Sequence, residues 1–303
     1  MIELVELTKV YRTGGGIRDV TFEVKNGEIV GFVGVNGAGK TTTIETAVGV
    51  KIPQKGEVRI DGKSILKDKV EASKLTGWVP EIPSFDPDMR AEDYFLYVCG
   101  LRGIPGHEAK ELAKKLFEEV GLSGHERKRI RQYSQGMRKR FALAISMISN
   151  PSNFLFDEVL NGLDPEGIRF FREFALRMRK ENAAVLFSSH ILSEVQNLAD
   201  RVVFIHKGRV VKVATMAEIE SMSRTKTFRV RFATPESAQR SSELLRGFGK
   251  DVKVEKGVVE IEEFNGDIEG IARAVKSFPD FLEMGWATKT LEDVFFETIG
   301  EAR

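Results

Sequence analysis

A glycine-rich segment near the N-terminus carries residues whose types and spacing suit phosphate chemistry. Residues 34–41 read GVNGAGKT and match the phosphate loop G-x-x-x-x-G-K-[ST] at every fixed position. Glycines let successive backbone N–H groups curl around a phosphate, Lys40 can reach β- and γ-phosphate oxygens, and Thr41 offers a hydroxyl to Mg²⁺. The pattern therefore predicts a nucleoside triphosphate site. The residues expected to form it are Asn36, Gly37, Ala38, Gly39, Lys40, Thr41 and Thr42.

The flanking residues supply the elements that such a loop needs. Residues 28–33 form an apolar run typical of a short buried strand, and residues 42–48 read as the start of a helix. The positive end of that helix adds to the field around a bound phosphate. A glycine-rich turn before a structural helix is the alternative, but it does not account for Lys40 and Thr41 in the required register.

A second chemical motif lies at residues 153–158, where an apolar run ends in two acids, Asp157 and Glu158. Such a run predicts a buried strand that delivers carboxylates to the carboxyl edge of an α/β sheet, where ligands bind. Asp157 is expected to hold Mg²⁺, and Glu158 to orient or deprotonate an attacking water. Alone, the motif would be an ordinary strand end; together with the phosphate loop it predicts hydrolysis.

Between these motifs lies the segment 133–140, YSQGMRKR. Ser134 is suited to cap a helix whose apolar face includes Phe141 and Ile145. The segment resembles the signature motif of ATP-binding cassette (ABC) proteins, and a helix N-terminus is a physically reasonable place to bind an anion. The resemblance implies that ATP is the nucleotide and that Ser134 and Gly136 meet the γ-phosphate in a partner subunit.

Three further matches to the ABC family follow its order along residues 1–215. Tyr11 stands where the family places an aromatic ring on adenine, although a packing role is the alternative. The segment 161–165 resembles the D-loop, which implies that Asp164 lies between two subunits. His190 ends another apolar strand and resembles the histidine that contacts the γ-phosphate.

The departures from the common ABC pattern indicate which branch of the family the chain resembles. Gln135 replaces a glycine and Met137 a glutamine, while Ser134 and Gly136 are retained. This form looks like the exporter ATPases for drugs, antibiotics and cell-surface polymers. The usual Pro-Thr after the catalytic glutamate is Val-Leu at residues 159–160, which removes no catalytic group.

Glu81 stands where most relatives have a glutamine. Glutamine both accepts and donates hydrogen bonds, whereas an ionised glutamate only accepts. A carboxylate still suits a Mg²⁺-bound water, and the resembling exporter branch often has glutamate here. We therefore expect Glu81 to keep the γ-phosphate-sensing role and to act near the metal.

The length of 303 residues suggests about two domains. The expected fold is α/β, a P-loop NTPase core of the ABC type over residues 1–220 with an inserted helical subdomain at about 85–150, then a small α+β domain over 221–303. Helical spacing of apolar residues predicts helices at 91–101 and 108–120.

In the last domain the patterns predict a strand at 228–232, a helix from 235 to 248, a hairpin across 252–261, a helix at 268–275 and a capping box at 290–293. For this domain a dimer-stabilising role is favoured over ligand sensing, because no polar constellation marks a pocket.

The net charge of +1 gives no global field for nucleic acid, so none is expected as a partner. The basic residues 127–131 lack interleaved aromatics and are interpreted as a solvated loop. Cys99 is the single cysteine, which excludes an internal disulfide and fits a reducing compartment. No signal-peptide pattern opens the sequence, and no apolar run approaches the ~18 residues that cross a bilayer.

The resemblance implies an ATPase subunit of an ABC exporter that works as a head-to-tail dimer, with ATP and Mg²⁺ as ligands. Its expected partners are transmembrane permease subunits and either a second identical chain or another ABC ATPase, which places it in the cytoplasm against the inner face of the cell membrane. The helical subdomain and the segment after Glu81 are the implied docking region, where Phe85, Met89, Tyr94 and Tyr97 serve either the partner or core packing. The alternative functions are a soluble ABC ATPase acting on ribosomes or DNA, and a regulator that barely hydrolyses ATP.

Overall fold

The computed structural model describes residues 1–12 and 14–301. The chain divides into two compact units, Met1–Met216 and Ala217–Gly300. The sequence placed the domain boundary between residues 220 and 221, inside the helix α8 (Met216–Ser223). Among the described residues, no helix has the length and apolar composition needed to cross a bilayer.

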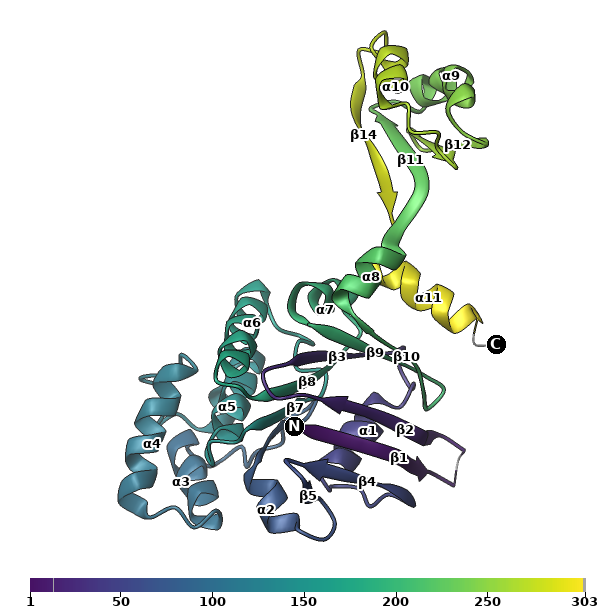
Figure 1. The fold of residues 1–303 in the computed structure, drawn as a ribbon. Coiled ribbons are helices and arrows are strands. Elements are labelled where there is room, and N and C mark those ends of the chain that lie inside the picture. Colours follow the sequence, from purple (N-terminus) through teal and green to yellow (C-terminus); the bar gives the residue numbers. More distant parts are fainter. Residues whose placement is uncertain (13, 302–303) are drawn as a thin grey trace. The chain divides into compact units, whose positions relative to one another are not determined.

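A six-stranded sheet forms the centre of the first unit (Figure 1). Its strand order is β10-β9-β3-β8-β7-β6, and all neighbouring pairs are parallel except β10 with β9. The inner strands β3, β7 and β8 are buried along their whole length, as their apolar sequences predict. The bounds are β3 (Ile29–Val33), β6 (Thr76–Val79), β7 (Asn153–Phe156), β8 (Ala184–Ser189), β9 (Arg201–His206) and β10 (Arg209–Thr215).

A four-stranded antiparallel sheet, in the order β2-β1-β4-β5, is the second layer. Its apolar side chains join those of the central sheet and of helix α1 (Lys40–Ala47) in one core, which includes Ile2, Phe22, Ile44 and Leu186. Burial of this shared core fixes α1, and with it the end of the phosphate loop. The strands are β1 (Ile2–Val10), β2 (Gly16–Val24), β4 (Lys55–Ile60) and β5 (Lys63–Ser64), followed by helix α2 (Lys69–Lys74).

Helix α6 (Pro165–Lys180) packs aromatic side chains against the central sheet. The ring of Phe171 lies 5.3 Å from that of Phe156, and Phe174 lies 5.9 Å from Phe154. Helix α7 (Leu192–Leu198) contacts β3. These contacts fix the position of β7, and thus of the two acids that follow it.

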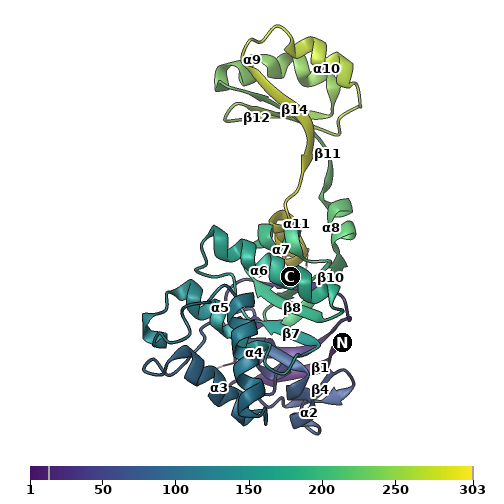
Figure 2. The ribbon, with the colours of Figure 1, turned by 90° about the vertical axis from the view of Figure 1, so that its left-hand side faces the viewer.

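The segment between β6 and β7 is helical, and Figure 2 shows α3 and α4 beside α5. The elements are α3 (Ala91–Leu101), α4 (Gly106–Glu119), the 3₁₀ turn η1 (Ile130–Gln132) and α5 (Gln135–Ser146). Their shared core is aromatic: the ring of Phe85 lies 5.0 Å from Phe141 and 5.2 Å from Tyr94. Phe85 and Tyr94 therefore pack inside the helical segment, whereas Tyr97 is 57% exposed.

The second unit is built on an antiparallel sheet of order β12-β13-β11-β14, whose buried face packs against α9 (Pro235–Leu245) and α10 (Ile268–Val275). The hairpin of β12 (Asp251–Glu255) and β13 (Val258–Glu262) was predicted, as were residues 228–232 of β11 (Arg224–Phe232). The first four residues of β11 and strand β14 (Phe281–Thr288) were not predicted. The 3₁₀ turn η2 (Arg246–Phe248) ends α9. Helix α11 (Leu291–Glu301) begins with the expected capping box, in which Thr290 and Asp293 bond each other's backbone N–H.

Candidate functional site

The phosphate loop connects the buried end of β3 to the first residue of α1, Lys40. Two of its glycines are required by close approach. A Cβ on Gly34 would lie 2.6 Å from the carbonyl oxygen of Ile205, and one on Gly39 would lie 2.7 Å from the Cγ2 of Ile17. Gly39 also has φ +111°, which L side chains rarely adopt. A side chain at either position would therefore collide with its neighbours, which explains why the loop has glycine there.

Asp157 lies directly past β7 and is buried, with 1% of its surface exposed. The hydroxyl of Ser188, at the neighbouring strand β8, donates to its Oδ1 over 2.7 Å and accepts the Glu158 N–H over 2.9 Å. Burial raises the pKa of Asp157, while hydrogen bonds from Ser188 and Thr41 oppose that rise. Ser188 thus sets the position of both acids, a role that the sequence analysis did not identify.

Glu158 makes two charged contacts inside the site. Its Oε1 lies 3.0 Å from Lys40 Nζ and its Oε2 lies 3.0 Å from His190 Nδ1. Burial raises the pKa of Glu158, but the contacts with Lys40 and His190 outweigh burial and the net shift is downward. Because an ionised carboxylate only accepts, His190 Nδ1 is the donor and its other ring nitrogen is left for a ligand.

A pocket of about 360 Å³ opens over these groups. It is lined by Gly16, Asn36, Gly37, Gly39, Lys40, Thr41, Thr42, Glu81, Glu158, Asn161 and His190. The structure thus brings the predicted phosphate loop together with Glu81, Glu158 and His190. Gly16 and Asn161 were not anticipated, since each reaches the pocket from a segment without a phosphate-binding pattern of its own.

The oxygen donors beside the pocket suit Mg²⁺. Thr41 is exposed to the pocket, and its hydroxyl interacts with the Asp157 carboxylate. Mg²⁺ prefers such hard oxygen ligands, usually one or two carboxylates completed by substrate phosphates and waters. In residues 1–12 and 14–301, no three His, Cys, Asp or Glu side chains are grouped to hold a metal without such help.

Tyr11 follows β1 and reaches the edge of the pocket, where its hydroxyl lies 3.4 Å from Thr42 Oγ1. The ammonium of Lys51 lies 5.1 Å from the centroid of the Tyr11 ring and 2.6 Å from Glu45 Oε2. Lys51 therefore covers one face of the ring, and a nucleotide base would stack on the other face.

Replacing Tyr11 with alanine is expected to raise the KM for ATP about tenfold, because base stacking on an aromatic ring contributes about 1–3 kcal/mol. The kcat should stay near the parent value. Tyr11→Phe keeps the ring and is the matched control, with a KM within about twofold. Steady-state kinetics over a range of ATP concentrations decides this. A parent-like KM for Tyr11→Ala would exclude base stacking and leave only a packing role for Tyr11.

The remaining predicted residues do not line this pocket. Ser134 caps α5 as predicted, since its Oγ accepts the Met137 N–H over 3.2 Å. Gly136 lies in the first turn of the same helix. Asp164 caps α6, its Oδ1 accepting the Gly167 N–H over 2.8 Å.

Comparisons with known proteins agree with this geometry. A sequence profile described as "ABC transporter" matches residues 17–161. The chain is 33% identical to an uncharacterized ABC transporter ATP-binding protein of Bacillus subtilis, YhcH, covering 100% of this chain and 97% of the relative. It is 34% identical to the bacitracin transport ATP-binding protein BcrA of Bacillus licheniformis, over 74% of this chain and 72% of that protein. A solved structure described as an ATP binding subunit of an ABC transporter aligns with a TM-score of 0.67 at 27% identity, over 73% of this chain and 92% of the other.

Proposed function

The chain belongs to the family of ABC transporter ATP-binding proteins, and we propose that it is the ATP-hydrolysing subunit of an exporter. The fold is that of an ABC ATPase. The observation that carries the proposal is the convergence of Lys40, Glu158 and His190 on one pocket, which the phosphate loop also lines. Transport, rather than another use of ATP, is supported by the likeness to a bacitracin transport ATP-binding protein, and export is our proposal for its direction.

The geometry suits water activation that depends on substrate. Lys40 Nζ bonds both Glu158 Oε1 and, over 2.7 Å, the carbonyl oxygen of Gly34. A γ-phosphate entering the pocket would take over the Lys40 ammonium and release Glu158, which then orients the attacking water and accepts its proton. His190 would bind the γ-phosphate through the ring nitrogen that Glu158 leaves free.

Thr41 and Asp157 would hold Mg²⁺, with Glu81 accepting from a water in its shell. The ion would supply charge neutralisation for the β- and γ-phosphates. Glu81 lies two residues past the end of β6 and lines the pocket, a position suited to sensing the γ-phosphate.

Each site would be completed by a second subunit. Ser134 and Gly136 lie at the exposed N-terminus of α5, away from the chain's own pocket, and such a helix end favours a phosphate. We assign them to the ATP bound by the other subunit of a head-to-tail dimer, with Asp164 at the interface. ATP binding would close the dimer and hydrolysis would open it.

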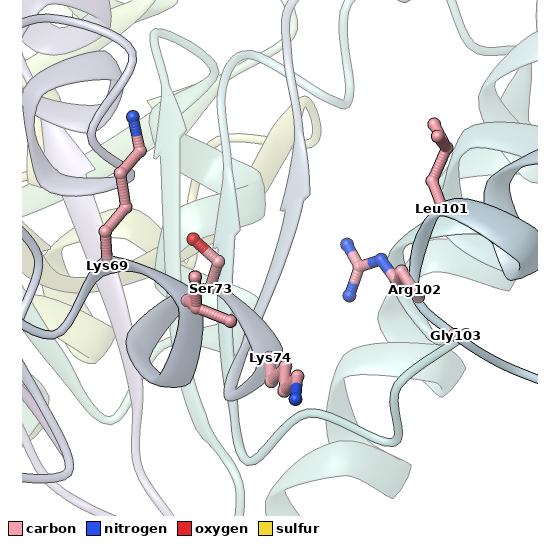
Figure 3. Close-up of a pocket in the computed structure, with 7 residues that line it drawn as sticks. Lys69, Ser73, Lys74, Leu101, Arg102 and Gly103 are labelled. Carbon is pink, nitrogen blue, oxygen red and sulfur yellow. The ribbon is translucent and has the colours of Figure 1, made fainter.

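A groove of about 550 Å³ between α2 and the end of α3 is the proposed docking site for the transmembrane subunit. Figure 3 shows Lys69, Ser73 and Lys74 on one side and Leu101, Arg102 and Gly103 on the other. Val70 and Leu101 are 62% and 70% exposed although they are apolar. Apolar side chains edged by basic groups suit an amphipathic segment that carries acidic residues. We propose that the transmembrane subunit supplies such a segment, with this chain at the inner face of the membrane.

The proposal is tested by pull-down of the tagged chain from detergent-solubilised membranes of its host. We expect a protein with several transmembrane helices, and we expect Leu101→Glu to lose it and its stimulation of ATP turnover, because a charge in the groove cannot be desolvated cheaply. Basal turnover should persist. Leu244→Glu, at an exposed apolar position of α9, is the control. Recovery of ribosomes or DNA alone would contradict the exporter proposal and support a soluble ABC ATPase instead.

A further inference from the structure

Lys139 of α5 is a buried cation that no predicted role accounts for. Its surface is only 4% exposed. Its Nζ donates to the carbonyl oxygen of Val159 over 2.7 Å, of Asn161 over 2.5 Å and of Glu158 over 3.3 Å. An ammonium has three N–H donors and no acceptor, so one loop uses all three of them.

Burying a charged ammonium at this position is energetically unfavourable unless its hydrogen bonds and nearby opposite charges compensate for the lost hydration. Burial lowers the pKa of Lys139, while the charges of Glu81 and Glu158 oppose that fall. All three hydrogen-bond acceptors are neutral backbone carbonyls. A methionine would fill a similar volume without desolvating a cation, so packing alone does not explain a lysine here.

The loop that Lys139 holds has a strained residue, and that residue is Glu158. Its φ is +44°, a left-handed conformation that is unfavourable for a residue with a side chain. Ser188 Oγ accepts its N–H over 2.9 Å, while its carbonyl oxygen accepts from the Asn161 N–H over 3.1 Å and from Lys139. Such conformations persist only where the surroundings fix them from several sides.

A second residue of the same helix reaches the far end of the loop. Gln135 precedes Lys139 by four residues and so lies on the same face of α5. Gly162 has φ +69°, and a Cβ there would lie 2.3 Å from Gln135 Nε2. The 135/139 face of α5 therefore contacts the loop at Glu158 and at Gly162.

We propose that Lys139 is a positioning residue that sets the direction of the Glu158 carboxylate by holding the backbone of residues 158–161. Because Ser134 caps α5 and Gly136 lies in its first turn, the same contacts make that direction depend on where the N-terminal end of α5 lies. The inference rests on the proposed hydrolytic role of Glu158 and deepens it. Lys139 touches neither nucleotide nor water in this role.

The test compares Lys139→Met, which keeps the length but has no donor, with Lys139→Gln, which keeps two donors. Single-turnover ATP hydrolysis should fall about 10- to 100-fold in Lys139→Met, since small misplacements of a catalytic group have effects of this order. Lys139→Gln should fall less. The Kd for ATP should change by less than about twofold, because the phosphate loop is untouched. Lys110→Met, an exposed lysine of α4, is the matched control.

Adding Lys139→Met to Glu158→Gln separates positioning from general structure. If Lys139 acts through Glu158, the double variant turns over at the rate of Glu158→Gln within about twofold, because the two changes remove the same contribution. If Lys139→Met lowers turnover in the Glu158→Gln background by as large a factor as it does in the parent, the proposal is overturned. Parent-like turnover of the Lys139→Met single variant overturns it as well. If Lys139→Met does not fold, Lys139→Gln carries the same comparison. Parent-like turnover of Glu158→Gln itself would instead overturn the proposed function.

Discussion

Replacing Glu158 with glutamine is expected to lower ATP turnover about 10²- to 10⁴-fold, the usual contribution of a positioned general base. The amide keeps the size of the side chain but accepts a proton poorly. It also removes the negative charge that lies 3.0 Å from Lys40 and competes with a phosphate for it, so ATP should bind at least as tightly as before. Bound but not hydrolysed, ATP should hold the dimer closed.

Two measurements check this expectation: steady-state phosphate release, and the apparent mass by gel filtration with and without Mg²⁺ and ATP. Glu243→Gln, at an exposed position of α9, controls for the loss of one charge. A Glu158→Gln protein that turns over at the parent rate would remove Glu158 from its role. One that stays monomeric with bound ATP would contradict the head-to-tail dimer.

Lys40→Met is expected to destabilise the nucleotide-free protein by about 3–5 kcal/mol, the effect of breaking a buried ion pair on one side. The side chains of Lys40 and Glu158 are only 5% and 6% exposed, so water would replace the lost partner incompletely. The His190 contact remains and offsets only part of the loss, because that side chain is 47% exposed and solvent screens its interaction with Glu158. ATP binding should be lost as well, since no other predicted group reaches the β- and γ-phosphates in the same way.

Urea denaturation of four proteins measures the ion pair directly: the parent, Lys40→Met, Glu158→Gln and the double variant. The double variant should recover most of the stability lost by Lys40→Met, because it no longer buries an unpaired carboxylate. If the two single effects simply add, the pair does not stabilise the folded state.

The dependence on pH has a definite sign. The pKa of Glu158 in the folded protein lies below its ordinary value of 4.5, so its ionisation stabilises the fold. That contribution is fully present above pH 4.5 and is lost as the pH falls through the folded-state pKa. At neutral pH the free energy of unfolding of the parent protein should therefore include the full contribution of the Lys40–Glu158 ion pair.

Features that depend on neighbours in sequence could be predicted from the sequence. The strand, loop and helix around Lys40, the Ser134 cap and the β12/β13 hairpin all follow from local spacing and turn chemistry, and the structure confirms each. Strand β14 could not be predicted in the same way. Its sequence, FLEMGWAT, does not alternate between apolar and polar residues, and Gly285 interrupts it. The structure shows why no alternation is needed: the large apolar side chains of Leu282 and Trp286 are both about half exposed.

Contacts between distant segments were also beyond the sequence. Ser188 and Lys139 are unremarkable in their local patterns, and their roles appear only when β8 and α5 are placed beside residues 157–161. The same holds for Phe85, which packs on Phe141 rather than facing outward. Long-range packing decides such roles, and one sequence contains no record of which segments meet.

The ion pair between Lys40 and Glu158 also bears on how the products leave. It is an intramolecular competitor for the γ-phosphate position, present at a high effective concentration whatever the ATP supply. ADP lacks the group that separates the pair, so the pair can re-form while ADP is still bound and oppose the return of phosphate. Product inhibition by inorganic phosphate should consequently be weak in the parent protein and stronger in Glu158→Gln, where Lys40 has no charged partner to return to.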